Sequence, residues 1–385
     1  MSFIITLLAA VFVFSAVIAI HEFGHFAVAK LCGVQVNEFS IGMGPVLLKK
    51  TQNGTQYSLR ALPVGGFVAL EGEESPESQQ AEKGERPDAE PQTPPSCSDA
   101  DGSPDGGAGN EEAPAQPVGK PLNEAAVWQR ALMAAGAFMN FLLGFVVMVI
   151  LIAAQSEPIT SRVIYAIDDG ALCGQTGLEA GDQVLAVNGR RCFVANDMLY
   201  ELMRTEDYAA RFTVLRGGEK VELPCVRFDT WQDDSGETHM SLGFTVYGIR
   251  KTPANVVKEA WNSVLYYGRI IFTSLMDLLR GRESINDLSG PVGIVTAIGQ
   301  AASYGWQDLL QLLVLITVNL GIFNLLPFPA LDGGKVVFLL IEGVTGHAVP
   351  EKIQSGLTLA AFALLFGLML FATYNDILRL ITGAV

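Results

Sequence analysis

The chain contains 385 residues, enough for about two or three domains, and half of them are apolar. The mean hydropathy of +0.33 is high for a soluble protein and is consistent with several membrane spans. The net charge is −15 and the sequence shows no basic face, so we expect no nucleic-acid partner. The five cysteines show no Cys-x-x-Cys spacing, which argues against a cysteine-based zinc site.

The first predicted element is an apolar helix over residues 1–30 that carries an HExxH motif near its end. It lacks the basic start and the cleavage site of a secretory signal, so we expect a retained transmembrane helix. His21 and His25 share one helix face, where two imidazoles can bind one Zn²⁺. Glu22 points to a different face and can act as a general base. Ionisable residues inside an apolar helix are usually functional, which favours a zinc site over a chance match.

Residues 33–70 contain short strand-like pieces that are separated by glycine-rich turns, one of them at Gly65 and Gly66, directly before Phe67. Exposed strand edges cannot face lipid, so a β element here packs on protein or lines a wet cavity in the membrane. An ordinary sheet beside the membrane is an equally good interpretation of the pattern.

An acidic, disordered linker is expected over residues 71–120, because this segment has hardly any large apolar residue to form a core. A second transmembrane helix is expected over residues 129–154. Basic residues gather between the first two spans, which by the positive-inside rule makes this connection cytoplasmic. They include Lys30, Lys49, Lys50, Arg60, Lys120 and Arg130. The region after the second span is then extracytoplasmic.

Residues 160–248 predict a mixed α/β domain. The segment 177–189 has the form GLxxGDxVLxVNG, and with it the domain resembles a bacterial-type PDZ domain. Such domains bind peptide ends by adding a strand to a sheet edge, so the resemblance implies a peptide ligand. A spacer or a steric filter is an equally good interpretation. Cys173, Cys192 and Cys225 could form at most one disulfide, and we expect free buried thiols.

Residues 253–285 alternate apolar and charged residues at roughly helical spacing. This pattern predicts an amphipathic helix that lies along the membrane surface or packs on the PDZ-like domain. A third transmembrane helix is expected over residues 307–345, with a sharp break at Pro327 and Pro329, and a fourth over residues 354–381. Four spans place both chain ends outside and place the break on the cytoplasmic side, at the same membrane face as the histidine pair.

Catalytic zinc commonly takes three protein ligands, and the chain has only two further histidines. His239 lies in the outer domain, on the wrong side of the membrane, and His347 lies in a polar loop. Asp332 follows the break near the proposed site, where an unpaired carboxylate is costly, and is the best candidate for the third ligand. Asn319 and Asn324, inside the third span, either bond an unwound substrate strand or bond neighbouring helices.

Three segments resemble the signatures of the site-2 protease family, and most closely those of its bacterial RseP/RasP branch of regulator-cleaving proteases. They are His21-Glu22-Phe23-Gly24-His25, Gly290-Pro291-Val292-Gly293-Ile294 and Asn324-Leu325-Leu326-Pro327-Phe328-Pro329-Ala330-Leu331-Asp332-Gly333-Gly334. The resemblance implies that His21, His25 and Asp332 hold one zinc ion per chain. It also implies that Glu22 is the base.

The same resemblance implies that the substrate is bound by Asn324 and by the element around Gly65, Gly66 and Phe67. Some members of the family have two PDZ domains, whereas this chain shows one, so gating by two domains is not carried over. The acidic insert has no counterpart that we can assign.

The sequence thus predicts a polytopic α-helical membrane protein with four transmembrane helices, a juxtamembrane β element and one extracytoplasmic PDZ-like α/β domain. We expect a zinc-dependent intramembrane endopeptidase of the bacterial cytoplasmic membrane, with its active site towards the cytoplasm. The expected substrates are transmembrane segments of single-span proteins such as anti-sigma factors, or signal-peptide remnants. The alternative is a catalytically silent membrane scaffold that presents a PDZ domain.

Overall fold

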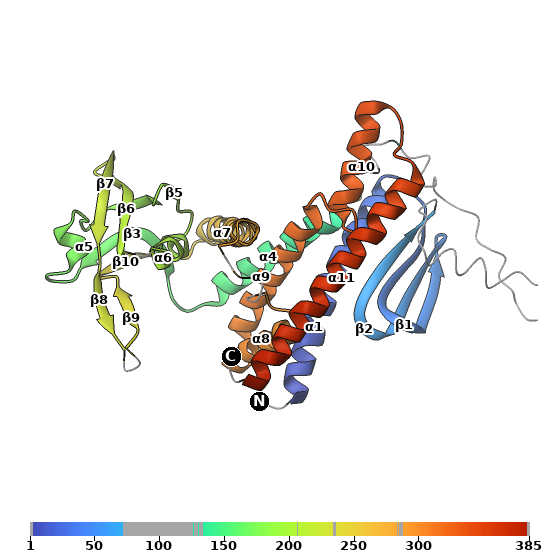
Figure 1. The fold of residues 1–385 in the computed structure, drawn as a ribbon, viewed down its shortest axis with the longest axis horizontal. Coiled ribbons are helices and arrows are strands. Elements are labelled where there is room, and N and C mark those ends of the chain that lie inside the picture. The colour runs from blue at the N-terminus through green and yellow to red at the C-terminus, as the bar shows by residue number, and fades with distance from the viewer. Residues whose placement is uncertain are drawn as a thin grey trace, which may run out of the picture.

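A computed structural model of the chain describes residues 3–71, 126, 130, 134–205, 207–233, 236–282, 284 and 288–382. Long helices form the middle of the molecule, with a β-sheet on one side and a mixed α/β module on the other (Figure 1). The acidic linker predicted over residues 71–120 lies, apart from residue 71, outside the described residues.

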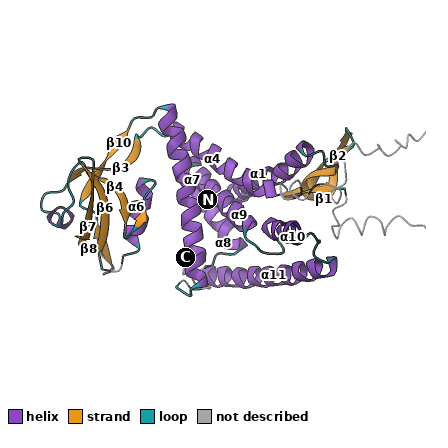
Figure 2. Ribbon diagram, turned by 90° about the horizontal axis from the view of Figure 1, so that it is seen from above, coloured by secondary structure: helices purple, strands orange, loops and turns teal. Residues whose placement is uncertain are grey.

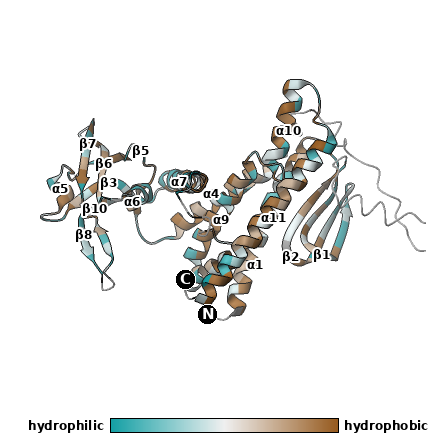
Figure 3. Cartoon of the chain, viewed as in Figure 1, coloured by the Kyte–Doolittle hydropathy of each residue, from teal (hydrophilic) through white to brown (hydrophobic). Residues whose placement is uncertain are grey.

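Four of the described helices are long and apolar enough to cross a membrane. They are α1 (Phe3–Leu31), α4 (Ala135–Ala154), α9 (Trp306–Leu325) and α11 (Glu351–Thr382). Hydrophobic residues cover these helices along most of their length (Figure 3). The chain therefore has the architecture of a polytopic membrane protein, as the sequence predicts.

Helix α1 has one face in the bundle core and the opposite face exposed. Val13 and Val17, four residues apart, are almost fully buried, whereas Ile4 and Leu8 are about two-thirds exposed. Exposed aliphatic side chains on a transmembrane helix are stable in lipid, so this pattern needs no protein partner.

Two further helices complete the bundle. Helix α8 (Pro291–Tyr304) packs against α1 and α9, and helix α7 (Pro253–Leu279) packs against α4 and α9. The start of α8 is held by Asp376 of α11, a buried carboxylate that accepts a hydrogen bond of 2.7 Å from the Gly293 backbone. A Cβ atom at Gly290 or Gly293 would come within 2.9 Å of the Asp376 carboxylate, so both glycines make room for this contact.

The β element is one sheet of two long strands, β1 (Val36–Gln52) and β2 (Thr55–Leu70). The first part of β1 lies between two parts of β2, since Ser40 pairs with both Ser58 and Phe67. Aromatic contacts of Phe26 with Phe39 and Tyr57 attach the sheet to α1. The segment predicted as separate short hairpins is thus a continuous, strongly bent sheet.

The described residues of the mixed α/β module form eight strands and two helices. They are β3 (Ile159–Ile167), α5 (Leu172–Gln175), β4 (Gln183–Val187), β5 (Arg190–Arg191), α6 (Ala195–Met203), β6 (Ala209–Arg216), β7 (Glu219–Arg227), β8 (Asp229–Gln232), β9 (Thr238–Ser241) and β10 (Phe244–Ile249). The main sheet has the order β10-β3-β4-β6-β7, with β5 beside β4, and β8 and β9 form a separate hairpin. The module has its own core around Phe212, Ile164 and Leu202.

The four cysteines within the described part of the chain are free thiols. Cys173 and Cys192 are buried and Cys225 is exposed. Burial raises the pKa of Cys192 to about 12, which keeps this thiol protonated and unreactive.

Helix α7 joins the module to the helical bundle, and both views place it between the two (Figure 2). Its Arg269 pairs with the fully buried Asp197 of α6, and its buried Asp277 pairs with Arg204 at the end of α6. A buried carboxylate that loses its partner is strongly destabilising. The two pairs therefore fix α6 on α7.

Glu259 of α7 lines a hollow of about 120 Å³ between this helix and the module, together with Arg162 and Lys258. Burial raises its pKa from the ordinary 4.5 to about 7, against the opposing charges of Arg162 and Lys258.

Because the folded state favours protonated Glu259, this residue should lower stability as the pH rises from about 4.5 to about 7. We expect Glu259→Gln to melt at the same temperature as the native protein at pH 4 and at a higher temperature at pH 8. Thermal unfolding of both proteins in detergent at the two pH values tests this. An equal difference at both pH values would contradict it.

Candidate metal centre

Two helices from opposite ends of the sequence bring three metal-binding side chains together. His21 and His25 come from α1, and Asp332 is the first residue of α10 (Asp332–Thr345). Oδ2 of Asp332 lies 3.3 Å from Nε2 of each histidine, and the two Nε2 atoms are 3.3 Å apart. The cluster that the sequence predicts is therefore assembled.

The geometry of the three donor atoms fits a zinc ion. A tetrahedral site with bonds of about 2.0–2.1 Å has ligand atoms roughly 3.3–3.4 Å apart, which matches the observed triangle. Oδ2 of Asp332 is buried and has no hydrogen-bond partner among the described residues. A carboxylate oxygen in such a place needs a cation beside it.

Glu22 lies beside this triangle and is not one of its corners. A Cβ atom at Gly66 would lie 3.2 Å from Cγ of Glu22 and 3.0 Å from the backbone oxygen of Ser40. The end of β2 therefore passes directly along the glutamate. Gly65, with φ +97°, lies within β2 directly before Gly66, and the ring of Phe67 lies under the Arg60 guanidinium at 4.8 Å.

Gly136 of α4 is a residue of the site that the sequence did not reveal. A Cβ atom there would fall 2.4 Å from Nε2 of His25 and 2.7 Å from Cε1 of His21. A Cβ atom at Gly24 of α1 would fall 2.6 Å from the backbone oxygen of Ala135. The two glycines thus let α1 and α4 cross in backbone contact exactly where the imidazoles lie.

Asn140 and Asn324 both contact the second ring nitrogen of His21. The amide nitrogen of Asn140 lies 3.3 Å from Nδ1, and that of Asn324 lies 3.5 Å from it. Asn140 did not enter the sequence prediction, although a polar residue in an apolar span is the signal that could have found it. Asn319 is exposed and does not reach the cluster.

The break between α9 and α10 gives Asp332 its place. Cβ atoms at Gly333 and Gly334 would fall 2.2 Å from the backbone oxygens of Leu326 and Phe328, so only glycine fits there. Towards its other end, α10 is held by Glu342, which pairs with Arg130 at 2.5 Å.

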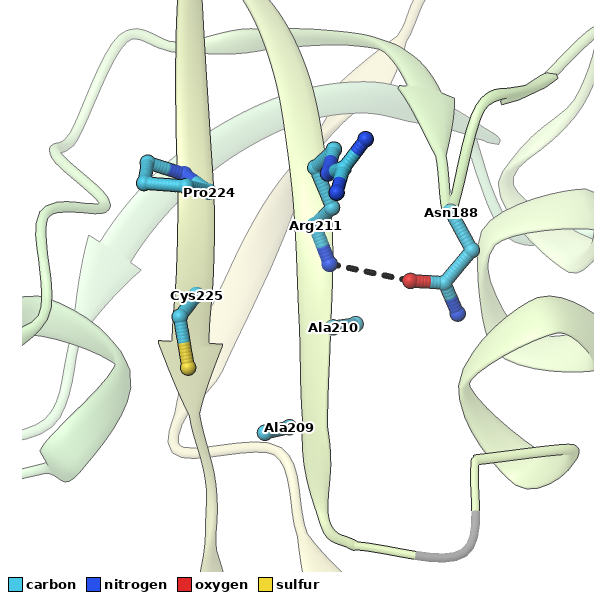
Figure 4. A pocket seen from close by; sticks show the side chains of 6 residues that line it. All are labelled: Asn188, Ala209, Ala210, Arg211, Pro224 and Cys225. Carbon is cyan, nitrogen blue, oxygen red and sulfur yellow. Dashed lines mark hydrogen bonds between the residues drawn. The ribbon is translucent and has the colours of Figure 1, made fainter.

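The two other histidines lie away from the cluster. His347 is exposed in the loop after α10. His239 of β9 pairs with Asp233 at 3.0 Å, and these two and Glu237 form a second, partly exposed group on the β8–β9 hairpin. A cavity of about 370 Å³ also lies in the module, lined by Asn188, Ala209, Ala210, Arg211, Pro224 and Cys225 (Figure 4). No residue of the metal cluster lines it.

Comparison with known proteins identifies the family of the chain. The sequence profile of peptidase family M50 matches residues 9–368. The chain belongs to peptidase family M50. The regulator of sigma-W protease RasP of Bacillus subtilis is 29% identical over 422 residues, which cover 98% of this chain and 99% of that protein. The zinc metalloprotease RasP of Geobacillus kaustophilus is 30% identical over 415 residues, which cover 97% of each chain.

M50 peptidases are the site-2 proteases, zinc-dependent metalloendopeptidases of membranes. The predicted family, the zinc cofactor and the metalloendopeptidase activity are thereby confirmed. This M50 chain is thus a multi-pass membrane enzyme whose family acts on peptide bonds within the membrane.

The close contact of Gly136 with both imidazoles yields one prediction. In Gly136→Ala the added methyl group would lie 2.4 Å from Nε2 of His25, so the rings must move. We expect zinc affinity to fall about 10-fold or more, measured by competition with a chromophoric chelator. The matched control is Gly144→Ala on the same helix, whose methyl group meets only side-chain carbons of Val318 and Thr317 at 3.0–3.2 Å. Native affinity in Gly136→Ala would be inconsistent with this geometry.

Removal of the Asp332 carboxylate should empty the site. We expect Asp332→Ala to purify with less than about a tenth of the native zinc, because two imidazoles alone bind zinc weakly. Chelation should inactivate the native protein and added zinc should restore it, whereas Asp332→Ala should remain inactive. The control is Asp308→Asn, an exposed aspartate in the first turn of α9. A full zinc complement in Asp332→Ala would contradict the assignment.

Proposed function

We propose that this M50 metalloendopeptidase hydrolyses peptide bonds inside the transmembrane segments of single-span membrane proteins, such as anti-sigma factors or signal-peptide remnants. The observation that carries the proposal is the place of His21 and His25 within the candidate span Ile4–Leu31, with Asp332 beside them. A metal centre at this position serves a substrate that is itself in the membrane. The name of the Bacillus subtilis relative, regulator of sigma-W protease, points to a regulatory substrate.

His21, His25 and Asp332 are the proposed ligands of one zinc ion. When bound, zinc supplies a Lewis acid that polarises the scissile carbonyl and acidifies a water molecule. Glu22 lies beside the ligand triangle and not in it, so its carboxylate is free to take the proton of the attacking water. It then returns the proton to the leaving amine.

A substrate helix must unwind before cleavage, because its carbonyl groups are engaged in backbone hydrogen bonds. We propose that the unwound strand is held along Gly65, Gly66 and Phe67. This part of β2 pairs with β1 on one side, and no described strand pairs with its other side. An extended peptide added there would run past Glu22 and satisfy its own backbone groups in lipid.

Asn324 and Asn319 are the proposed polar contacts of that strand. Asn324 is largely buried beside His21, and Asn319 is exposed on another face of α9. The two residues would meet different parts of a substrate.

The α/β module is proposed to be a PDZ-like domain. Its strand β10 is an edge of the main sheet and follows the segment Ser241-Leu242-Gly243, and α6 packs on the same sheet. An edge strand beside a helix can accept a peptide as an added strand. Steric control of substrate access is the second role that we propose for it.

The proposed orientation places the module outside the cell and the metal centre towards the cytoplasm. It rests on the basic residues from the last turn of α1 to the start of α4, which include Lys30, Lys49, Lys50, Arg60 and Arg130. Helix α1 begins and α11 ends on the same side of the bundle, as four crossings require (Figure 1). The bacterial cytoplasmic membrane is the proposed location.

The alternative of a catalytically silent scaffold has no observation in its favour. Its test is Glu22→Gln, which should bind native amounts of zinc and lose cleavage of a single-span model substrate by at least about 100-fold, because general base catalysis is lost. Native and variant proteins are compared in liposomes with a set of single-span substrates by gel mobility and mass spectrometry.

The matched control is Glu179→Gln, an exposed glutamate of the α/β module that should cleave at the native rate. Cleavage of the same substrates by Glu22→Gln at the native rate would reject Glu22 as the base. Cleavage by the native protein only outside the transmembrane segment would reject the intramembrane proposal.

A further inference from the structure

The two imidazoles of the centre differ in how their second nitrogen is supported. Nδ1 of His21 faces the amide of Asn140 at 3.3 Å, whereas Nδ1 of His25 is buried without a hydrogen-bond partner among the described residues. Asn140 is fully buried, and its side-chain oxygen also has no partner in the described part of the chain. Among the described residues, His21 is therefore the one side chain within hydrogen-bond distance of the Asn140 amide.

A neutral imidazole that coordinates a metal through Nε2 carries its proton on Nδ1. Nε2 of His21 is the atom that faces Asp332 and His25, so Nδ1 must donate. The backbone of Gly136 also hydrogen-bonds this ring and is an acceptor beside Asn140. The side-chain nitrogen of Asn140 cannot accept the hydrogen bond from Nδ1–H of His21, but the side-chain oxygen of Asn140 can. Nitrogen and oxygen of an amide occupy almost equivalent positions, so a half-turn of the side chain places the unpartnered oxygen at Nδ1.

Asn140 is better placed for this task than Asn324. It is closer to Nδ1, it is fully buried where Asn324 is 8% exposed, and it lies in the second turn of α4 rather than in the last turn before a break. Its backbone carbonyl accepts a hydrogen bond of 3.2 Å from the buried Thr317 hydroxyl of α9, a contact that does not involve the side-chain amide.

We propose that Asn140 is a positioning residue of the metal centre, which accepts the Nδ1–H of His21 and so presents Nε2 unprotonated to the metal. Helix α4 then contributes twice to the site, through the space at Gly136 and through the acceptor one turn later. The inference rests on the proposed ligand role of His21. It leaves Asn324 free for the substrate.

The test measures metal binding of the full-length protein in detergent, without any substrate. We expect Asn140→Leu, which has a similar volume and no acceptor, to bind Zn²⁺ about 10–100-fold more weakly than the native protein. Asn140→Asp keeps an acceptor oxygen and should stay within about threefold of the native affinity or exceed it. The visible spectrum of the Co²⁺-loaded protein should change in Asn140→Leu and be native in Asn140→Asp.

Two controls separate positioning from packing. Thr317→Val removes the hydroxyl that bonds the Asn140 backbone and should bind zinc as the native protein does. Asn324→Leu should also keep native zinc affinity while it slows cleavage.

Native zinc affinity in Asn140→Leu would overturn the proposal, as would a greater loss in Asn324→Leu. If Asn140→Leu does not fold, Asn140→Asp decides: an affinity loss of more than tenfold means that the amide does not accept from His21. Because these readouts need no proteolysis, a negative result here leaves the proposed function standing. That proposal is tested separately, by the cleavage assays with the native protein and Glu22→Gln.

Discussion

The structure depends on the meeting of one buried carboxylate with two imidazoles inside apolar helices. Oδ2 of Asp332 lies 3.3 Å from both Nε2 atoms and has no hydrogen-bond partner among the described residues. An uncompensated charge in such surroundings costs several kcal/mol, so the arrangement is stable only with a cation between the donors. A zinc ion held by the proposed ligands would join α1 to α10.

Small residues allow this meeting. Gly24 and Gly136 bring the backbones of α1 and α4 together, and Gly333 and Gly334 fold the chain back tightly before α10. Helices in lipid gain little from hydrophobic packing against one another, so close backbone approach is their main source of association. The same approach makes the centre intolerant of added volume, since almost every methyl group placed here would meet backbone or an imidazole.

The sequence predicted the features that depend on local pattern. Four spans follow from hydropathy, and the histidine pair and Asp332 follow from helical spacing and from the cost of an unpaired carboxylate. Pairwise distances follow from tertiary packing, so the contact of Gly136 with both imidazoles had no sequence signal. The same holds for the pairs of Arg269 with Asp197 and of Arg204 with Asp277, which fix the module on α7.

In the β element the sequence pattern predicts separate hairpins, whereas the structure has one continuous sheet. The sequence predicts glycine-rich turns that end short strands in this segment, and Gly42 and Gly44 do have positive φ. In the structure they bend β1 without ending it, because the partner strand β2 follows the bend through several register shifts. Turn residues alone do not distinguish a hairpin end from a bulge.

The distance along the chain between His21 and Asp332 has a consequence for biosynthesis. A ribosome delivers the two histidines first, and the aspartate only after the module and α9 have been made. During most of translation the emerging polypeptide holds two imidazoles and no third donor, so it is inert towards the lipid-embedded helices that surround it. If Asp332 is the third ligand, proteolytic capacity arises late in synthesis, and a product terminated before Asp332 never acquires it.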